Sequence, residues 1–391
     1  YAELFRRGAA HRPEDLAKIP TLRIADLDRQ GKTIPTEERA AGGAPLLFHD
    51  LFTNGIVYLD LAFDLRALPA ELLPFAPLFA RALTEMGTAK EDFVRLVQRI
   101  GRDTGGVWAS PMTAAHLQTG DYLGRFMVRG KAMVPQAPKL LAIMRDILLT
   151  VRLDDQERFR QIVTRARAGR ESSLVPSGNA YARRRVAARL DASEWAEEVM
   201  GGISSLFFLR ELERRIEGDW PGVLADLEAV RRHLVNRGGL VLNLTVDEAG
   251  YREVAPALDE FVAELPAADY TPAVWRTLAD APDEGLIIPA KVNYVAKAAN
   301  LRAAGVEVGG AASAVTRFLN ISYYLEKIRV QGGAYGAGAS YDRSTGLFSA
   351  TSYRDPNLLR TLEVYDGTAD FLRSVSLDPV TVERSIIGTI G

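Results

Sequence analysis

The chain has 391 residues, more than one ordinary hydrophobic core holds, so its length suits two domains. A composition of 47% apolar and 25% charged residues is typical of a globular protein, and the formal net charge of -2 gives no general attraction to nucleic acid or acidic membranes. The absence of cysteine excludes disulfides, thiolate metal sites and a thiol nucleophile, and no apolar run is long enough to span a membrane.

Residues 1–43 are polar and interrupted by prolines, and they are expected to form a connecting segment. The chain starts at Tyr1 instead of Met and stops at IIGTIG without a helix-stop signal. Both ends are therefore expected to be cuts in a longer chain, so the sequence does not reveal a targeting signal.

Residues 44–265 are expected to form the first α+β domain. Alternating and helical spacings of apolar residues predict these elements in order: a strand at 55–65, helices at 71–87 and 91–101, a strand at 121–133, a helix at 137–151, charged helices from 155 to about 236, and a strand at 238–248. The helical region is interrupted at 175–181, VPSGNAY. Residues 266–285 hold three prolines and are expected to be an inter-domain linker.

Residues 286–391 are expected to form a second, incomplete α+β domain. The pattern predicts strand material at 286–301, a helix at 309–329, a strand at 346–354 and a helix at 355–375. Asp355 is expected to be the N-cap of that last helix, with Pro356 at its first position.

The two halves repeat each other. GGVWASP (105–111) precedes a strand and PKLLAIMRD, while GGAYGAG (332–338) precedes a strand and PNLLRTLEV. Repeats separated by more than 200 residues do not indicate a solenoid. They predict a duplicated fold, with two homologous domains that each consist of a sheet and its helices.

Metal and hydrolase motifs are absent. No two of the four histidines, His11, His49, His116 and His233, share a helix face, so neither H-E-x-x-H nor H-x-x-E-H occurs. Each histidine is more typical of a surface or packing residue. The pentapeptide G-x-S-x-G is also missing, and the nearest sequence, GGISSLF (201–207), is typical of a turn between two helices.

The glycine-rich stretch RVQGGAYGAG (329–338) is the most unusual sequence in the chain. A phosphate loop would need a lysine after the glycines, and a dinucleotide fingerprint would need the order strand, glycines, helix; here the order is helix, glycines, strand. A tight turn into a strand explains the glycines. Arg329 and Tyr335 flank that turn, and they either end the helix and pack, or offer two donors to one developing oxyanion.

Long motifs here resemble a known family. The stretch RVQGGAYGAGASYDRSTGLFSATSYRDPNLLRTLEVYDGTADFLR (329–373), with support from IPTLRIADL (19–27), TNGIVYLDLAFDL (53–65), ELLPFAPLFARALTEMGT (71–88) and GGISSLFFL (201–209), resembles the presequence-protease branch of the pitrilysin/insulinase family of zinc metallopeptidases. The resemblance covers essentially the whole chain.

The resemblance implies an enzyme of four homologous α+β domains, whose two halves are joined by a helical hairpin and close on a peptide. Zinc, its H-x-x-E-H motif and a distal Glu ligand belong to the first half, whereas the second half supplies an Arg and a Tyr, which map onto Arg329 and Tyr335. This chain would be the second half: a hairpin remnant (1–43), the third domain (44–265), the linker (266–285) and part of the fourth domain (286–391). It would hold no metal itself; the helix with PLFARALTEMGT has no His, and the first repeat has Trp108 where the second has Tyr335.

The resemblance also implies partners and a mechanism. Arg329 and Tyr335 would hold the substrate carbonyl, and an extended peptide would bind at Gly332, Gly333 and Ala334 by pairing with the sheet edge. The partners are the N-terminal zinc-binding half of the same protein and a short unfolded peptide such as a targeting presequence, with no nucleic acid and no membrane. The chain alone is expected to be inactive, and its location is expected to be the bacterial cytoplasm or an organelle matrix.

Two alternatives remain open at this point. The chain could be a zinc-less scaffold subunit of the same family, or, least favoured, a nucleotide-binding domain. The arginine run ARRRVAARL (182–190) is interpreted as a solvated helix face, with contact to an acidic peptide or to the other half as the alternative. Arg354 is interpreted as part of a helix cap.

Overall fold

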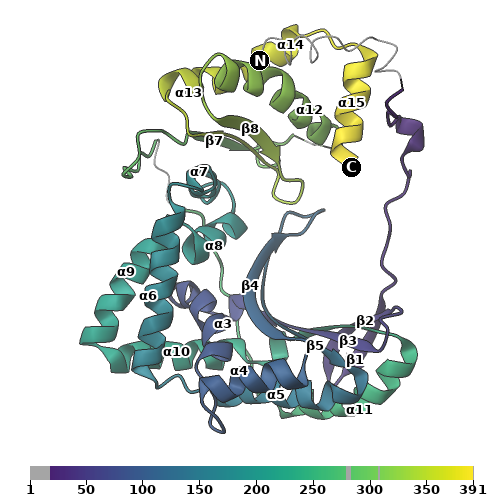
Figure 1. Ribbon diagram of the computed structural model, residues 1–391, viewed down its shortest axis with the longest axis vertical. Coiled ribbons are helices and arrows are strands. Elements are labelled where there is room, and N and C mark those ends of the chain that lie inside the picture. Colours follow the sequence, from purple (N-terminus) through teal and green to yellow (C-terminus); the bar gives the residue numbers. More distant parts are fainter. Residues whose placement is uncertain (1–17, 279–282, 307–308, 391) are drawn as a thin grey trace, which may run out of the picture.

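The computed structural model describes residues 18–278, 283–306 and 309–390. These residues form two bodies, each built on its own β-sheet (Figure 1). The larger body lies at the bottom of the view and the smaller one at the top, and an extended N-terminal segment runs between them along the right. In that segment the 3-10 helix η1 (Ile24–Asp26) reaches the small body, where the Ile24 N–H donates to Glu383 Oε1 at 3.2 Å.

The larger sheet has six strands in the order β1-β2-β6-β3-β5-β4, in which β2 and β6 are parallel and all other neighbours are antiparallel. Its strands are β1 (Glu37–Ala41), β2 (Ala44–Asp50), β3 (Ile56–Asp64), β4 (Val107–Ala115), β5 (Tyr122–Met133) and β6 (Val241–Val246). Alternate residues of β3, including Leu59, Leu61 and Phe63, are buried because successive side chains point to opposite faces. That face packs on helices, while the opposite face looks toward the small body (Figure 1).

The helices of the large body lie below the sheet and to its left in Figure 1. In chain order they are η2 (Leu65–Ala67), η3 (Ala70–Phe75), α3 (Ala76–Glu85), α4 (Phe93–Asp103), η4 (Val134–Gln136), α5 (Ala137–Thr150), α6 (Gln156–Ser173), α7 (Gly178–Ala187), α8 (Ala192–Gly201), α9 (Ile203–Gly218), α10 (Trp220–Leu234), η5 (Arg237–Gly239) and α11 (Glu248–Glu264). One apolar core joins them to the sheet and extends to Trp275, which stacks on Tyr122 at 5.2 Å between ring centroids.

The smaller body has a three-stranded antiparallel sheet in the order β7-β9-β8. Its elements are β7 (Ala296–Asn300), α12 (Ala311–Leu319), the π-helix η6 (Asn320–Val330), β8 (Gly336–Tyr341), β9 (Leu347–Tyr353), α13 (Leu359–Asp366), α14 (Thr368–Ser374) and α15 (Pro379–Ile390). A second core lies between η6 and the sheet, centred on Tyr324, which is fully buried, and Ile328. The Tyr324 hydroxyl is 2.8 Å from the Thr368 hydroxyl, so this buried phenol has a hydrogen-bond partner.

The two bodies meet at α7, which packs on β7 and β9 of the small sheet. The Tyr294 ring lies directly over Gly178 at the start of α7, where an added Cβ would overlap the ring atoms. The Tyr294 hydroxyl donates to the Val175 carbonyl, and Asn300 Nδ2 donates to the Leu190 carbonyl at 3.2 Å. A glycine at 178 is therefore required for this close approach.

The predicted α+β class is confirmed, and most predicted elements are present within a few residues of their expected bounds. Three expectations are wrong in detail. Part of the expected connector forms β1, a short charged edge strand paired with β2. Within 286–301 the strand structure is limited to β7 and an isolated bridge between Asn293 and Asp355, and Pro289 lacks the N–H that a ladder needs at its position. The expected helix at 355–375 starts later and is divided into α13 and α14.

The repeat predicted from the two glycine pairs is visible in the order of elements. In the large body α4 leads through Gly105 and Gly106 into β4, which pairs with β5 before α5 begins. In the small body η6 leads through Gly332 and Gly333 into β8, which pairs with β9 before α13 begins. The second glycine of each pair has a positive φ, 120° for Gly106 and 80° for Gly333. Both turns therefore favour glycine, because a residue with a Cβ would be strained in this conformation.

Candidate functional site

The glycine turn of the small body ends a π-helix. The Gln331 N–H donates to the Glu326 carbonyl at 2.9 Å, five residues back, as in the rest of η6. Gly333 then donates to the Arg329 carbonyl at 2.9 Å, and Ala334 donates to the Ile328 carbonyl at 3.1 Å. This nested pair of bonds, with Gly333 in the left-handed region, is how a helix is closed by glycine.

Arg329 and Tyr335 lie on either side of this closed turn, and both side chains are exposed. Tyr335 is 69% exposed. Within the described residues, the Arg329 side chain has no hydrogen bond or ion pair, and the Tyr335 hydroxyl has no hydrogen bond. The turn therefore presents two hydrogen-bond donors to the surroundings, one of which is permanently charged.

The backbone and ring of Tyr335 are held in place by the strand β9. Its N–H donates to the Tyr353 carbonyl at 3.1 Å, and its ring meets the Tyr353 ring edge-on with centroids 5.7 Å apart. Arg354 follows with a φ of 49°, unusual for a residue other than glycine, and its guanidinium lies over the Tyr353 ring at 5.5 Å from the centroid. Arg354 therefore lies beside the site, and its side chain caps no helix, contrary to the sequence-based expectation.

A buried carboxylate fixes the other side of the turn. Asp355 is fully buried and accepts hydrogen bonds from the Asn357 N–H at 2.9 Å and the Thr361 hydroxyl at 2.6 Å. Asn357 Nδ2 in turn donates to the Gly332 carbonyl at 2.7 Å. The expectation that Asp355 is the N-cap of the following helix is wrong, because α13 begins at Leu359 and Asp355 organises the preceding turn.

The edge of β8 is partly closed by a side chain from η6. Asn320 Nδ2 donates to the Ala339 carbonyl at 2.9 Å, and the Ala339 N–H donates to Asn320 Oδ1 at 2.5 Å. This amide imitates a neighbouring strand, so an added peptide cannot pair with β8 at Ala339. Closer to the turn, the N–H groups of Gly333 and Ala334 and the carbonyl of Gly332 already have partners inside the protein. The described contacts include no hydrogen bond to the carbonyls of Gly333 and Ala334. Gly333 is exposed, whereas Ala334 is buried in the small core, so Gly333 offers the more accessible acceptor for the expected peptide.

Across the described residues, no group of three or more His, Cys, Asp or Glu side chains could hold a metal ion. The histidines there make ordinary contacts; His49, for example, lies 2.7 Å from Asn243 Oδ1. No described helix is both long and apolar enough to cross a lipid bilayer.

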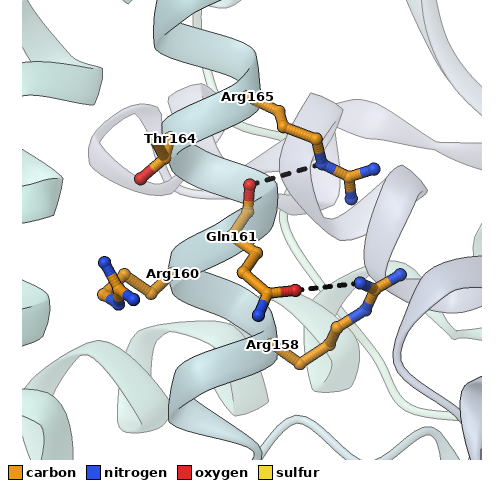
Figure 2. A pocket seen from close by; sticks show the side chains of 5 residues that line it. All are labelled: Arg158, Arg160, Gln161, Thr164 and Arg165. Carbon is orange, nitrogen blue, oxygen red and sulfur yellow. Dashed lines mark hydrogen bonds between the residues drawn. The ribbon is translucent and has the colours of Figure 1, made fainter.

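A hollow on the surface of α6, lined by Arg158, Arg160, Gln161, Thr164 and Arg165, is remote in the chain from the glycine turn (Figure 2). Its arginines are largely occupied. Arg158 Nη1 donates to Gln161 Oε1 at 3.0 Å, Arg160 pairs with Glu157 at 2.7 Å, and Arg165 pairs with Glu85. The hollow is consistent with the solvated side of a helix, and it does not indicate a ligand site.

The arginine run at 182–190 is not a purely solvated face. Arg183 pairs with Glu194 at 3.1 Å, and Arg184 Nη1 donates to the Gly201 carbonyl at 2.9 Å. Arg185 pairs with Glu198 at 3.2 Å and with Glu284 at 2.8 Å. These ion pairs and hydrogen bonds connect α7 to α8 and to the segment that leads into the small body. The arginines therefore make intramolecular contacts that stabilise the fold.

Family models match most of the chain. A model for the region associated with M16 peptidases of subfamily C matches residues 2–212, and one described as "PreP C-terminal domain" matches residues 283–391. The chain belongs to the presequence-protease branch of the M16 peptidases. The family resemblance based on the motifs is thereby confirmed.

Curated relatives are longer than this chain. Presequence protease 1, chloroplastic/mitochondrial, of Arabidopsis thaliana is 40% identical over 97% of this chain, which spans 35% of that protein. Protein HypA of Clostridium perfringens is 29% identical over 98% of this chain, which spans 39% of it. Members of the branch thus extend well beyond the part that corresponds to these 391 residues.

Solved structures show the same fold at low sequence identity. A peptidase M16 inactive domain from Pseudomonas fluorescens is 18% identical, with a TM-score of 0.61 over 91% of this chain and 84% of that one. A periplasmic protease from Escherichia coli is 12% identical, with a TM-score of 0.56 over 98% of this chain and 44% of that one.

Proposed function

We propose that this chain is the zinc-less half of a metalloendopeptidase that degrades short unfolded peptides, and that Arg329 and Tyr335 act on the substrate. The observation that supports the proposal most directly is the pair of exposed donors, without partners in the described part of the chain, on a glycine turn held by backbone hydrogen bonds. Both donors are exposed, so water satisfies them in the free protein and a peptide carbonyl would take the place of that water.

The guanidinium of Arg329 would hold the carbonyl oxygen of the scissile bond, and the phenol of Tyr335 would donate to the same oxygen as it becomes an oxyanion. A donor that is already oriented loses little entropy when the reaction starts, and removing one such donor typically costs about 2.7–4 kcal/mol of transition-state stabilisation. When zinc is bound in the other half, it supplies polarisation of the carbonyl and a more acidic bound water.

The fixed surroundings of the turn support this role. The Tyr335 backbone is bonded to β9, and the Gly332 carbonyl is bonded to Asn357, so the positions of both donors depend on backbone that cannot easily shift. An extended peptide would place an N–H group toward the carbonyl of the exposed Gly333. Because Asn320 closes the edge at Ala339, the peptide would leave β8 before that point.

The proposed partner is an N-terminal zinc-binding half of the same protein, consistent with relatives of which this chain spans only 35–39%. The proposed substrates are targeting presequences and similar peptides, as the name of the Arabidopsis relative indicates for that protein. The proposed location is an organelle matrix or the bacterial cytoplasm.

The test uses the full-length enzyme and a fluorogenic peptide. Arg329→Ala and Tyr335→Phe should each lower kcat by about 10²-fold while the melting temperature stays unchanged, because both side chains are exposed. Trp108→Phe, in the corresponding turn of the first repeat, is the matched control and should retain full activity. Normal turnover in both Arg329→Ala and Tyr335→Phe would exclude the catalytic role.

The second candidate is a non-enzymatic scaffold of the same family. It is favoured by the structural similarity to a protein described as an inactive M16 domain. It predicts that the complete gene encodes no H-x-x-E-H motif, whereas the peptidase proposal requires that motif upstream of these residues.

A further inference from the structure

The two repeats carry the same arginine before their glycine turns. RDTGGVW (102–108) and RVQGGAY (329–335) align without a gap, so Arg102 corresponds to Arg329, and Trp108 corresponds to Tyr335. Each arginine is the second-last residue of its helix, and the glycine pair begins three residues after it. The chain thus contains two versions of one loop that differ in the residues around the arginine.

In the first repeat the arginine is occupied by its neighbour. Arg102 Nε lies 3.1 Å from Asp103 Oδ1, and Arg102 Nη2 lies 2.7 Å from Asp103 Oδ2, which is a bidentate ion pair. Lys139 at the start of α5 donates to the same carboxylate at 3.3 Å. The hydrogen bond from Arg102, and after it that from Lys139, lowers the pKa of Asp103 to about 2, which means that both contacts stabilise the charged carboxylate.

In the second repeat each of these anchors is replaced. Val330 stands where the first repeat has Asp103, and Asn357 stands where it has Lys139; Asn357 bonds to the Gly332 carbonyl instead. The nearest acidic residue along the helix, Glu326, accepts a hydrogen bond from Gln331 Nε2 at 2.9 Å. That contact follows from the five-residue spacing of the π-helix, and Arg329 has no side-chain partner among the described residues.

We propose that Val330 is a positioning residue: a side chain without charge at this place keeps the Arg329 guanidinium available to the substrate, and an aspartate there would capture it as Asp103 captures Arg102. This inference rests on the proposed function of Arg329. The first repeat displays the captured state on the corresponding loop. The surroundings differ, since Asp103 is buried at the end of an α-helix and Val330 is exposed at the end of a π-helix.

The size of the effect follows from the exposure of the pair. The Arg102 side chain is 72% exposed, and exposed ion pairs contribute little, so a captured Arg329 would still be released to the transition state at a modest cost. Val330→Asp is therefore expected to lower kcat/KM about twofold to fivefold at low salt, well short of the loss in Arg329→Ala. Val330→Asn has a similar shape without the charge and should be close to the natural enzyme. At about 1 M salt, where the Debye length falls to roughly 3 Å, the difference between the two variants should shrink.

Val330 is 65% exposed, so neither substitution should disturb folding, and thermal melting checks this. The assay is cleavage of a fluorogenic peptide by the full-length enzyme. Asp103→Val is the matched variant in the first repeat, and it should leave cleavage unchanged because Arg102 has no assigned role in it.

A double-mutant cycle identifies how Val330→Asp acts. If it acts through Arg329, adding it to Arg329→Ala should produce no further loss. An equal additional loss in the Arg329→Ala background would mean that the new charge acts on the substrate directly, and this would overturn the inference. A normal rate in Val330→Asp combined with a slow Arg329→Ala would also overturn it while leaving the proposed function intact; a normal rate in Arg329→Ala would reject the proposed function itself.

Discussion

The glycines of the turn at 332–336 provide a graded test of how firmly the fold holds the two donors. An alanine at Gly336 would have its Cβ 3.8 Å from the Tyr353 Cβ, an ordinary contact, so Gly336→Ala should be nearly neutral. At Gly333 the nearest atom to a new Cβ is Pro356 Cγ at 3.7 Å, so space is available, but φ is +80°. At Gly332 a new Cβ would stand 2.5 Å from the Ile328 carbonyl oxygen, which belongs to the helix backbone.

These geometries give an order of costs. For Gly333→Ala the left-handed conformation costs about 1–2 kcal/mol, and the smaller entropy of the unfolded alanine chain offsets about 0.4–1 kcal/mol of this. For Gly332→Ala the backbone must move, which costs about 1–3 kcal/mol for the overpacking and about 1 kcal/mol if the hydrogen bond from Asn357 to the Gly332 carbonyl is lost. The expected order of local destabilisation is therefore Gly336→Ala, then Gly333→Ala, then Gly332→Ala.

Hydrogen exchange is the suitable measurement because the change is local. Tryptophan fluorescence would not report on it, since all four tryptophans, at 108, 195, 220 and 275, precede the small body. A local cost of about 2 kcal/mol corresponds to roughly 30-fold faster exchange of the Ala334 and Tyr335 amides. If Gly332→Ala exchanges as slowly as Gly336→Ala, the turn is not held as described, and the claim that its rigidity positions Tyr335 fails.

Two further predictions concern the first repeat and the contact between the bodies. The pKa of Asp103 is lowered to about 2 in the folded protein, so its contribution to stability is present above the ordinary aspartate pKa and is lost as the pH falls toward 2. The melting temperature should therefore decline between about pH 4 and 2, and Asp103→Asn should remove the part of this decline that Asp103 causes. Gly178→Ala would push a Cβ into the Tyr294 ring, so limited proteolysis should cut the segment before β7 faster than in the natural chain. Gly169→Ala is the control and should have no effect, because no atom lies within 4 Å of a new Cβ there.

Much of the fold could be predicted because its long elements have clear periodicity. In the first part of β3, buried Val57, Leu59 and Leu61 alternate with the more exposed Tyr58 and Asp60. The helix α5 and the helices of 156–234 carry apolar stripes. The missed strand β1 is short and charged, so its sequence resembles a connector, and its pairing with β2 supplies what local propensity does not. Similarly, nothing in the local sequence of the expected helix at 309–329 indicates that its second half is a π-helix.

The candidate site was predictable only in part. Arg329, Tyr335 and the glycines stand out in the sequence as unusual residue types, whereas Asn320 and Asn357 look like ordinary polar residues. Their roles depend on partners that the fold brings close: Asn320 closes the β8 edge at Ala339, and Asn357 fixes the Gly332 carbonyl. Such contacts join elements that are separated along the chain, and a pattern within one element does not reveal them.

The comparison of the two repeats shows why a matching motif is weak evidence for a matching role. Trp108 differs visibly from Tyr335, but Arg102 and Arg329 are identical in type and position, and sequence alone would assign both the same chemistry. A guanidinium that is already paired must give up its partner before it can bind a substrate, and Arg102 is paired with Asp103 whereas the corresponding neighbour of Arg329 is Val330. On this proposal the two loops differ in whether the arginine charge is available, and Val330→Asp would transfer the captured state of Arg102 to Arg329.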